Sequence, residues 1–396
     1  MPQKSSPEQY NAFKAAWKRF CSDQLALSAL IMLMLLVLIA LTAPLLANPR
    51  PLLEYIPGKG VSMPFWRSFF VPETTEVFIE QLFNYLLLAL PGVLLIRLLI
   101  KHKLLRRIFT ALLLLLMILP FALTKPKLER VNYRNTPVPA GGVRIMAPLP
   151  YGPFEQNLTL PCSKPTLKNP MGTDDLGRDL MTRIIYGCRI SLAVGLLSTI
   201  LAALIGITIG VSSGYIGGWF DIIVMRLVEI LMCFPVFLLL LIVMTYFQDY
   251  QFEQSILAVT LIIGLTSWIG MAQLARGEVL KLREMAYIKA AAGLGISPVK
   301  IVFRHILPNI AGTIIIAFSF SVAGAILAES SLSFLGFGVH PPTASLGDML
   351  RTVFDTQIDA WHLALFPGLM LLWIVGSFNL VGEGLRKTLD RKTVRK

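Results

Sequence analysis

Residues able to do chemistry are sparse and scattered in this 396-residue chain. The four cysteines form no C-x-x-C pair, and His305, His340 and His362 stand too far apart to predict a metal site. No nucleophile triad, paired carboxylate or H-E-x-x-H motif is present, and no G-x-x-x-x-G-K-[ST] loop that would cradle a nucleotide phosphate occurs. We therefore expect no catalytic residue, no metal and no bound cofactor in this chain.

Charged residues inside long apolar stretches are the other candidates, because a charge in hydrocarbon is costly and usually functional. Arg226 and Glu229 are such a pair, three residues apart on one face of a helix. Two interpretations stay open: an ion pair within the helix, with Asp221 nearby, or a contact with a polar path or a partner subunit. Glu329 and Glu383 fall at the ends of apolar stretches, where we expect water to be close.

The composition identifies the environment of the chain. Hydrophobic residues make up 55% of it and charged residues only 15%, with a mean hydropathy of +0.68, which excludes an ordinary soluble or disordered protein. The net charge of +13 comes from Lys and Arg residues that lie mostly between apolar stretches, so nucleic-acid binding is not expected. The uncharged stretch 24–49 is too long for the apolar part of a signal peptide. We expect an all-α polytopic membrane protein that retains its first span.

Apolar stretches of about 20 residues, with Arg97 near the end of the second and Arg226 and Glu229 inside the fifth, predict eight spanning helices. Each must be helical, since a spanning segment must satisfy its own backbone hydrogen bonds. They cover residues 24–47, 81–100, 108–124, 190–211, 222–247, 254–275, 309–328 and 363–382. Short loops rich in Lys and Arg alternate along the chain, which places both termini in the cytoplasm.

The same pattern divides the chain into five parts. We expect a cytoplasmic tail over 1–23 and a first transmembrane helix over 24–47. Outer segments over 48–164 then flank a transmembrane hairpin, and the long outer loop is rich in Pro and Gly, which predicts mostly coil. A core domain over 165–385 contains a cytoplasmic loop, 276–308, and a basic cytoplasmic tail follows over 386–396.

The loop 276–308 has the pattern of two helices joined by a glycine turn. Gly293 and Gly295 interrupt helix-forming residues, and Ser297 and Pro298 then suit the N-cap and first position of a second helix. An apolar face, small at its centre, is predicted on the first helix from Tyr287, Ala290, Ala291 and Leu294. Such a face is suited either to close approach by another protein or to lying on lipid headgroups.

This loop resembles the EAA signature of ABC-importer permeases, which marks their cytoplasmic coupling helix. Residues 287–295 read YIKAAAGLG, and a Leu-Pro pair follows at 307–308. Two positions depart from the signature: Lys289 stands where an acidic residue is usual, and His305 where an aliphatic one is usual. The resemblance implies an ATPase-coupling loop made of Glu284, Tyr287, Lys289, Ala290, Ala291, Gly295, Leu307 and Pro308.

Other blocks resemble the second, "C-type", permease subunit of the dipeptide, oligopeptide and nickel importers. They lie at 171–191, 214–221 (GYIGGWFD), 329–338 (ESSLSFLGFG) and 378–386 (FNLVGEGLR). The first block carries a motif made of Gly172, Thr173, Asp174, Gly177, Arg178 and Asp179. Two roles stay open for this motif: ion pairs of Asp174 or Asp175 with nearby arginines that orient the following helix, or docking of a binding protein.

The resemblance implies a type I ABC-importer permease core and half of a translocation path for di- or oligopeptides in the inner membrane. The implied partners are a second homologous permease, two cytoplasmic ATPase subunits that bind ATP and Mg, an extracytoplasmic solute-binding protein and the lipid bilayer, without nucleic acid. Six spans are usual for this subunit. The hairpin 81–124 is therefore an addition, which either faces lipid or contacts the binding protein or the second permease.

Two other classes of membrane protein fit parts of the pattern. An ion-coupled transporter usually carries buried carboxylates and inverted repeats, whereas only Glu229 lies at depth and no repeat is visible. A sensor or scaffold would leave the inner loop unexplained. The importer permease is the stronger hypothesis, and it predicts that a bulky residue at Gly295, or Ala291→Glu, uncouples transport.

Overall fold

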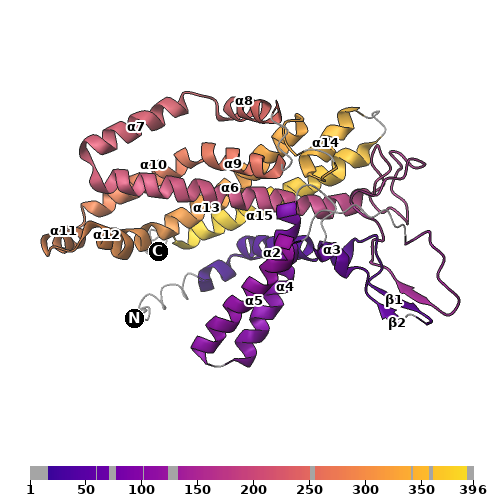
Figure 1. Ribbon diagram of the computed structural model, residues 1–396. Coiled ribbons are helices and arrows are strands. Elements are labelled where there is room, and N and C mark those ends of the chain that lie inside the picture. Colours follow the sequence, from indigo (N-terminus) through magenta and orange to yellow (C-terminus); the bar gives the residue numbers. More distant parts are fainter. Residues whose placement is uncertain are drawn as a thin grey trace.

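A computed structural model of the chain describes residues 17–58, 60–70, 77–100, 102–123, 133–249, 255–339, 342–355 and 360–389. Long helices lie side by side, and a small sheet stands at one end of them (Figure 1). The helices are α2 (Gln24–Leu46), α3 (Trp66–Phe70), α4 (Val77–Leu99), α5 (Lys103–Leu123), α6 (Leu180–Ile216), α7 (Gly218–Met232), α8 (Val236–Asp249), α9 (Ser255–Thr266), α10 (Trp268–Arg283), α11 (Ala286–Gly293), α12 (Pro298–Ile301), the π-helical turn η1 (Val302–Ile306), α13 (Leu307–Phe334), α14 (Leu346–Asp355) and α15 (Trp361–Leu389).

Helix α6 is the central element, in contact with α2, α4, α9, α10, α13 and α14. Its 37 residues extend about 55 Å at 1.5 Å per residue, well beyond a hydrocarbon layer of about 30 Å. The predicted span 190–211 lies inside it. The helix begins earlier because Asp179 caps it, accepting a hydrogen bond from the Thr182 amide at 2.8 Å.

Close packing of α6 on α10 follows from a row of glycines. A Cβ atom on Gly206 would lie 2.6 Å from the carbonyl oxygen of Trp268, and one on Gly210 would overlap the carbonyl of Ala272. Gly214 continues the row one turn further, where a Cβ atom would lie 3.0 Å from the Arg276 carbonyl oxygen. The row includes a G-x-x-x-G spacing at Gly206 and Gly210, which suits this contact because glycine allows two helix backbones to approach.

Within the described residues, six helical stretches are long and apolar enough to cross a membrane, and one bent pair gives a seventh. The six are Gln24–Leu46, Phe78–Leu99, Leu180–Ile216, Ile256–Arg283, Pro298–Phe334 and Trp361–Leu389. The predicted single helix over 222–247 is wrong: α7 and α8 bend by 79° at a break that contains Pro235. Because α5 is helical but is not among these stretches, the predicted total of eight stays a prediction.

Contacts between chain ends define one end of the bundle. Lys387 near the end of α15 lies 3.4 Å from Asp23, which caps the start of α2. Leu389 lies beside Gly312 at the start of α13, the helix that follows α11, α12 and η1. Figure 1 shows α11 and α12 at this end and the sheet with α14 at the opposite end. The cytoplasmic location of this end stays a prediction.

The segment that contains the extra hairpin begins and ends in one small sheet. Strands β2 (Gly60–Ser62) and β3 (Val143–Ile145) flank β1 (Leu53–Ile56), both antiparallel to it. Arg144 and Glu54, both largely buried, form an ion pair at 2.6 Å across β1 and β3. The all-α prediction did not include this sheet, because strands of only three or four residues give too short a pattern to recognise in the sequence.

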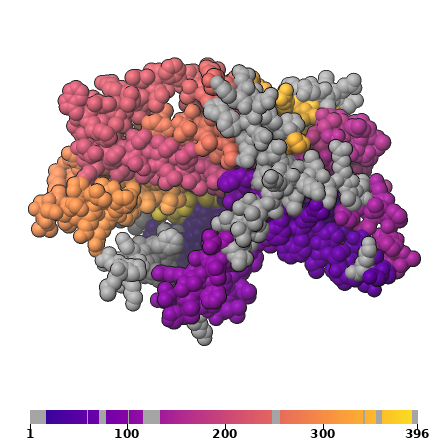
Figure 2. All heavy atoms as spheres, viewed as in Figure 1, coloured from indigo at the N-terminus to yellow at the C-terminus, as the bar shows by residue number. Residues whose placement is uncertain are grey.

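Arg189 of α6 fastens the hairpin to the core. Its guanidinium donates to the side chain of Asn84 in α4 at 3.0 Å and to the carbonyl oxygens of Ala40 and Leu41 in α2. The Ala40 carbonyl needs this donor, since Pro44 has no N–H with which to complete the helical bond. One buried cation therefore joins three helices, while α4 and α5 protrude from the body in Figure 2.

We predict that Gly210→Leu prevents stable packing of α6 on α10. A side chain at this position must displace backbone, at a cost of about 3 kcal/mol or more. The measurement is the melting temperature of the detergent-solubilised protein. Gly324→Leu is the matched control, because nothing lies within 4 Å of a Cβ atom at Gly324; equal melting temperatures for the two variants would refute the packing argument.

Candidate functional site

The inner loop has the predicted order of helix, glycine turn and helix. α10 ends at Arg283, α11 covers Ala286–Gly293, and α12 begins at Pro298. Pro298 occupies the first helical position as predicted, whereas Ser297 stands at the N-cap position without a side-chain capping bond. The loop then passes through η1 directly into α13, so Leu307 and Pro308 form the first turn of that helix.

Gly295 fixes the turn between α11 and α12. It has a φ of +75°, in the left-handed region that favours glycine. The amide of Gly295 donates to the Ala292 carbonyl at 3.0 Å, and the amide of Ile296 donates to the Ala291 carbonyl at 3.2 Å. This pair of bonds is a Schellman motif, which satisfies the last carbonyls of α11. The turn is therefore a defined structure rather than a flexible link.

The loop has one buried and one exposed apolar face. The buried face packs on α6, α10 and the start of α13, and it consists of Ile288, Ala291, Ile301 and Ile306. The exposed face includes Tyr287, Leu294, Val299 and Phe303, with Leu294 at 82% exposure. The predicted grouping of Ala291 with Tyr287, Ala290 and Leu294 is thus corrected: Ala291 points into the core, and the other three lie exposed. The loop that carries this face is drawn in orange at the left-hand end of the molecule in Figure 2.

Lys289 is paired within the loop. Its ammonium lies 2.7 Å from the carboxylate of Glu284, and both side chains are exposed. The hydrogen bond and charge of Lys289 lower the pKa of Glu284. The residue that departs from the EAA signature therefore has an acidic neighbour within the loop, five residues earlier in the chain.

At the opposite end, the motif before α6 forms a buried cluster of hydrogen bonds and ion pairs, the polar cluster. The Asp174 carboxylate accepts from the amides of Leu176 and Arg178 at 3.0 and 2.9 Å and from the Arg178 guanidinium at 2.6 Å. Arg178 also lies 3.4 Å from Asp175. The helix cap is not Asp174 but Asp179, which is held by the Asn169 side chain at 2.8 Å. The structural role predicted for this motif fits this geometry.

The remaining motif residues pack closely around this polar cluster. Thr173 donates to the Leu160 carbonyl at 2.6 Å, and its own carbonyl lies 3.1 Å from the ring of His362 in α15. Gly172 and Gly177 both have positive φ, and a Cβ atom on Gly177 would overlap the backbone of Asn157. Glycine at both positions is therefore required by conformation and by space.

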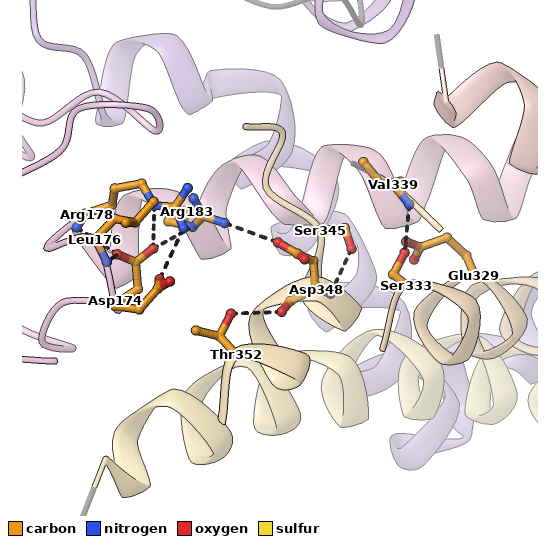
Figure 3. A network of polar contacts seen from close by, with 11 residues as sticks. Asp174, Leu176, Arg178, Arg183, Glu329, Ser333, Val339, Ser345, Asp348 and Thr352 are labelled. Carbon is orange, nitrogen blue, oxygen red and sulfur yellow. Dashed lines mark hydrogen bonds and ion pairs between the residues drawn. The ribbon is translucent and has the colours of Figure 1, made fainter. Parts of the chain in front are cut away.

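Arg183 connects the polar cluster to α14. Its guanidinium, only 1% exposed, lies 3.3 Å from Asp174 and 3.6 Å from Asp348 of α14, as Figure 3 shows. Burial raises the pKa of Asp348, while Arg183 acts in the opposite direction. The resemblance alone did not single out Asp348, which follows Arg183 by 165 residues. The folded arrangement brings the two charges together.

The charged residues predicted within spans have three different surroundings. Arg226 and Glu229 form the expected ion pair, at 2.6 Å and largely exposed. Asp221 does not join them: it binds Arg276 of α10 through two contacts at 2.5 and 2.6 Å. Glu383 pairs with Arg386 at 2.9 Å near the end of α15.

Glu329 contradicts the expectation of nearby water. Its side chain is fully buried, at 0% exposure, in the last third of α13. Hydroxyls of Ser191, Ser330 and Ser333 lie against its carboxylate. A carboxylate near the end of a span thus turns out to be enclosed by protein, because the segment that follows α13 folds back over it.

No group of three or more His, Cys, Asp or Glu side chains suited to a metal exists among the residues that the structure describes. His362 is buried against the polar cluster, His305 is half-buried in η1, and His340 lies outside the described residues.

Sequence comparisons assign the chain to a family, and the longer match includes the inner loop. Residues 206–395 match the family model described as the inner membrane component of binding-protein-dependent transport systems, and residues 11–57 match the N-terminal transmembrane domain of oligopeptide transport permease C. The chain belongs to this family of transport permeases.

Named relatives resemble the permease over most of their length. A glutathione transport system permease protein of Pectobacterium atrosepticum is 38% identical over 228 residues, which cover 58% of this chain and 74% of that protein. A dipeptide transport system permease protein of Bacillus subtilis is 37% identical over 247 residues, covering 62% of this chain and 76% of that protein. The permease is therefore a multi-pass membrane protein of the inner membrane.

We predict that Arg183→Met destabilises the permease strongly. The substitution removes the buried cation that lies between the carboxylates of Asp174 and Asp348. Breaking a buried pair costs about 3–5 kcal/mol, whereas loss of an exposed pair costs at most about 1 kcal/mol. Arg226→Met is the matched control. The measurement is the fraction of each variant that remains monodisperse after heating in detergent; similar losses in both variants would contradict the assigned role of Arg183.

Proposed function

We propose that this permease forms half of the translocation path of an ATP-driven importer of di- or oligopeptides. The observation that carries the proposal is the exposed apolar face of the inner loop, held in one shape by the Schellman turn at Gly295 and by a buried face packed on α6, α10 and α13. An exposed patch of this kind on a structured element is typical of a docking surface. Separate ATPase subunits are the partners that it suits.

The loop is joined mechanically to the spans. α10 leads into it and α13 leads out of it through η1 without an intervening coil. Ile288 and Ala291 on the loop share a core with Val279 of α10 and Ile310 of α13. A force applied to the exposed face would therefore move these two helices, and this is how hydrolysis in the partner subunits would change access to the path.

The substrate class rests on the relatives. Those named above are permeases of glutathione and dipeptide transport systems, and both solutes are short peptides. We infer a peptide substrate, delivered by an extracytoplasmic binding protein. ATP and Mg would be bound by the partner ATPases, and this chain would act without catalysis.

A second permease would complete the path, and α7 is the helix best suited to contact it. Only Val228 of α7 is buried, and the exposed residues around Arg226 and Glu229 are apolar. An ion pair facing hydrocarbon is costly, whereas a protein partner can offer it polar groups. We therefore place the second permease against α7 rather than against the hairpin.

We predict that Leu294→Asp abolishes recovery of ATPase subunits with the tagged permease and reduces peptide uptake at least tenfold. The substitution puts a charge on the most exposed of the four residues named on this face, without touching the core. Affinity purification from native membranes, followed by mass spectrometry and an ATPase assay, measures recovery. Leu158→Asp changes another largely exposed leucine, at the opposite end, and should keep the partners; retention of ATPase subunits by Leu294→Asp would exclude this docking surface.

We also predict that Gly295→Ala weakens coupling while Gly293→Ala does not. Alanine at a φ of +75° costs about 1–2 kcal/mol, whereas Gly293 is helical, and alanine there favours the helix by about 1 kcal/mol. No atom lies within 4 Å of a Cβ at either glycine, so only backbone strain separates the two variants. Peptide uptake per ATP hydrolysed is the measurement, and a lower ratio in Gly293→Ala than in Gly295→Ala would count against the turn.

A further inference from the structure

Glu329 lies in a cage of hydroxyl groups. The Ser333 hydroxyl donates to one carboxylate oxygen at 2.8 Å, and the hydroxyls of Ser330 and Ser191 approach the other at 3.3 and 3.4 Å. Ser345 supplies a fourth hydroxyl next to this carboxylate. No Lys or Arg of the described residues forms an ion pair with Glu329. Since a carboxylate offers about four lone-pair sites, four hydroxyls match its capacity as an acceptor.

Two of these serines also bind the backbone of the segment that follows α13. The amide of Val339 donates to the Ser333 hydroxyl at 3.2 Å, and the amide of Asp348 donates to the Ser345 hydroxyl at 3.1 Å. Each hydroxyl thus accepts from backbone and has its single hydrogen left for Glu329. Figure 3 shows Ser333 and Val339 beside Glu329, and Ser345 with Asp348 between them and Arg183.

The segment concerned is the outer cap, residues 335–339 and 342–355, which contains α14. It packs closely on α13: a Cβ atom on Gly347 would lie 2.8 Å from the Cβ atom of Ser333, and one on Gly338 would overlap the Ser333 side chain. Ala344 and Leu346 are buried at 1% and 0% exposure. The outer cap is therefore held against the core over its length, with Glu329 under it and Arg183 at its side.

We propose that Glu329 is the positioning residue that fastens the outer cap to α6 and α13, and that transport requires this fastening. The second half of the proposal rests on the proposed function; the first does not. α13 runs unbroken from Leu307, next to the inner loop, to Glu329 and beyond. The helix that emerges from the proposed ATPase contact therefore also carries the carboxylate that holds the outer cap.

The first experiment measures fastening directly. The four native cysteines are replaced by serine or alanine, and Ala344→Cys serves as a buried reporter in the outer cap. Maleimide labelling of the purified, detergent-solubilised chain is followed in time. We expect Glu329→Ala to raise the labelling rate at least tenfold, with Glu329→Gln between it and the parent because the amide keeps one acceptor oxygen. Glu383→Ala, an acidic residue of α15 in an exposed pair, should leave the rate unchanged.

A second pair of variants keeps the proposal testable if Glu329→Ala does not fold. Ser345→Ala removes one donor and one acceptor from the cage and should raise the labelling rate about threefold. Ser212→Ala is its control, because within the described residues the Ser212 hydroxyl donates to carbonyls of its own helix, at 2.7 and 3.0 Å. Unchanged labelling in both Glu329→Gln and Ser345→Ala would overturn the fastening.

The requirement of this fastening for transport is tested in the complex, with the native cysteines of the chain in place. We expect Glu329→Gln to lower peptide uptake at least fivefold while the recovered ATPase subunits and basal ATP hydrolysis stay at parent levels, an outcome that general misfolding would not give. Normal uptake in a variant with raised labelling would overturn the requirement for fastening. Absence of ATPase subunits from the parent complex would instead refute the proposed function and leave the labelling result intact.

Discussion

A charge enclosed in an apolar bundle must find its partner inside that bundle, because desolvation costs several kcal/mol per ion. The permease meets this constraint with side chains that each connect separate helices. Arg189 joins α6 to α2 and α4, and Arg183 joins α6 to α14. The Asp221 and Arg276 pair joins α7 to α10. The polar groups therefore specify which helices are neighbours, while the glycine row of α6 sets how closely they approach.

The two ends of the bundle use this constraint differently. At the end with the sheet, the motif before α6, the outer cap and the start of α15 form one buried polar network, in which Asp174 and Glu329 each accept several hydrogen bonds. At the other end, the inner loop satisfies its backbone through the turn at Gly295 but leaves apolar side chains exposed. One end is thus completed within the chain, and the other has a surface that suits a partner.

The sequence predicts most of the helices and the inner loop, because these depend on local signals: uncharged stretches, glycines, and a proline at the first helical position. It does not predict contacts that depend on distant residues. The pairing of Asp221 with Arg276, the burial of Ala291 and the enclosure of Glu329 each require knowledge of which helices are neighbours. The break at Pro235 had a local signal in the proline itself, and an uninterrupted apolar stretch concealed it.

The sheet at the base of the hairpin bears on the order in which the molecule is made. Glu54 and Arg144 are 90 residues apart, so the whole hairpin leaves the ribosome before its base closes. Arg189, which fastens the hairpin to α2, is synthesised later still. Since β1 and β3 bring the two ends of this segment together, the chain can close the segment first and attach its hairpin to the core afterwards, when Arg189 meets Asn84.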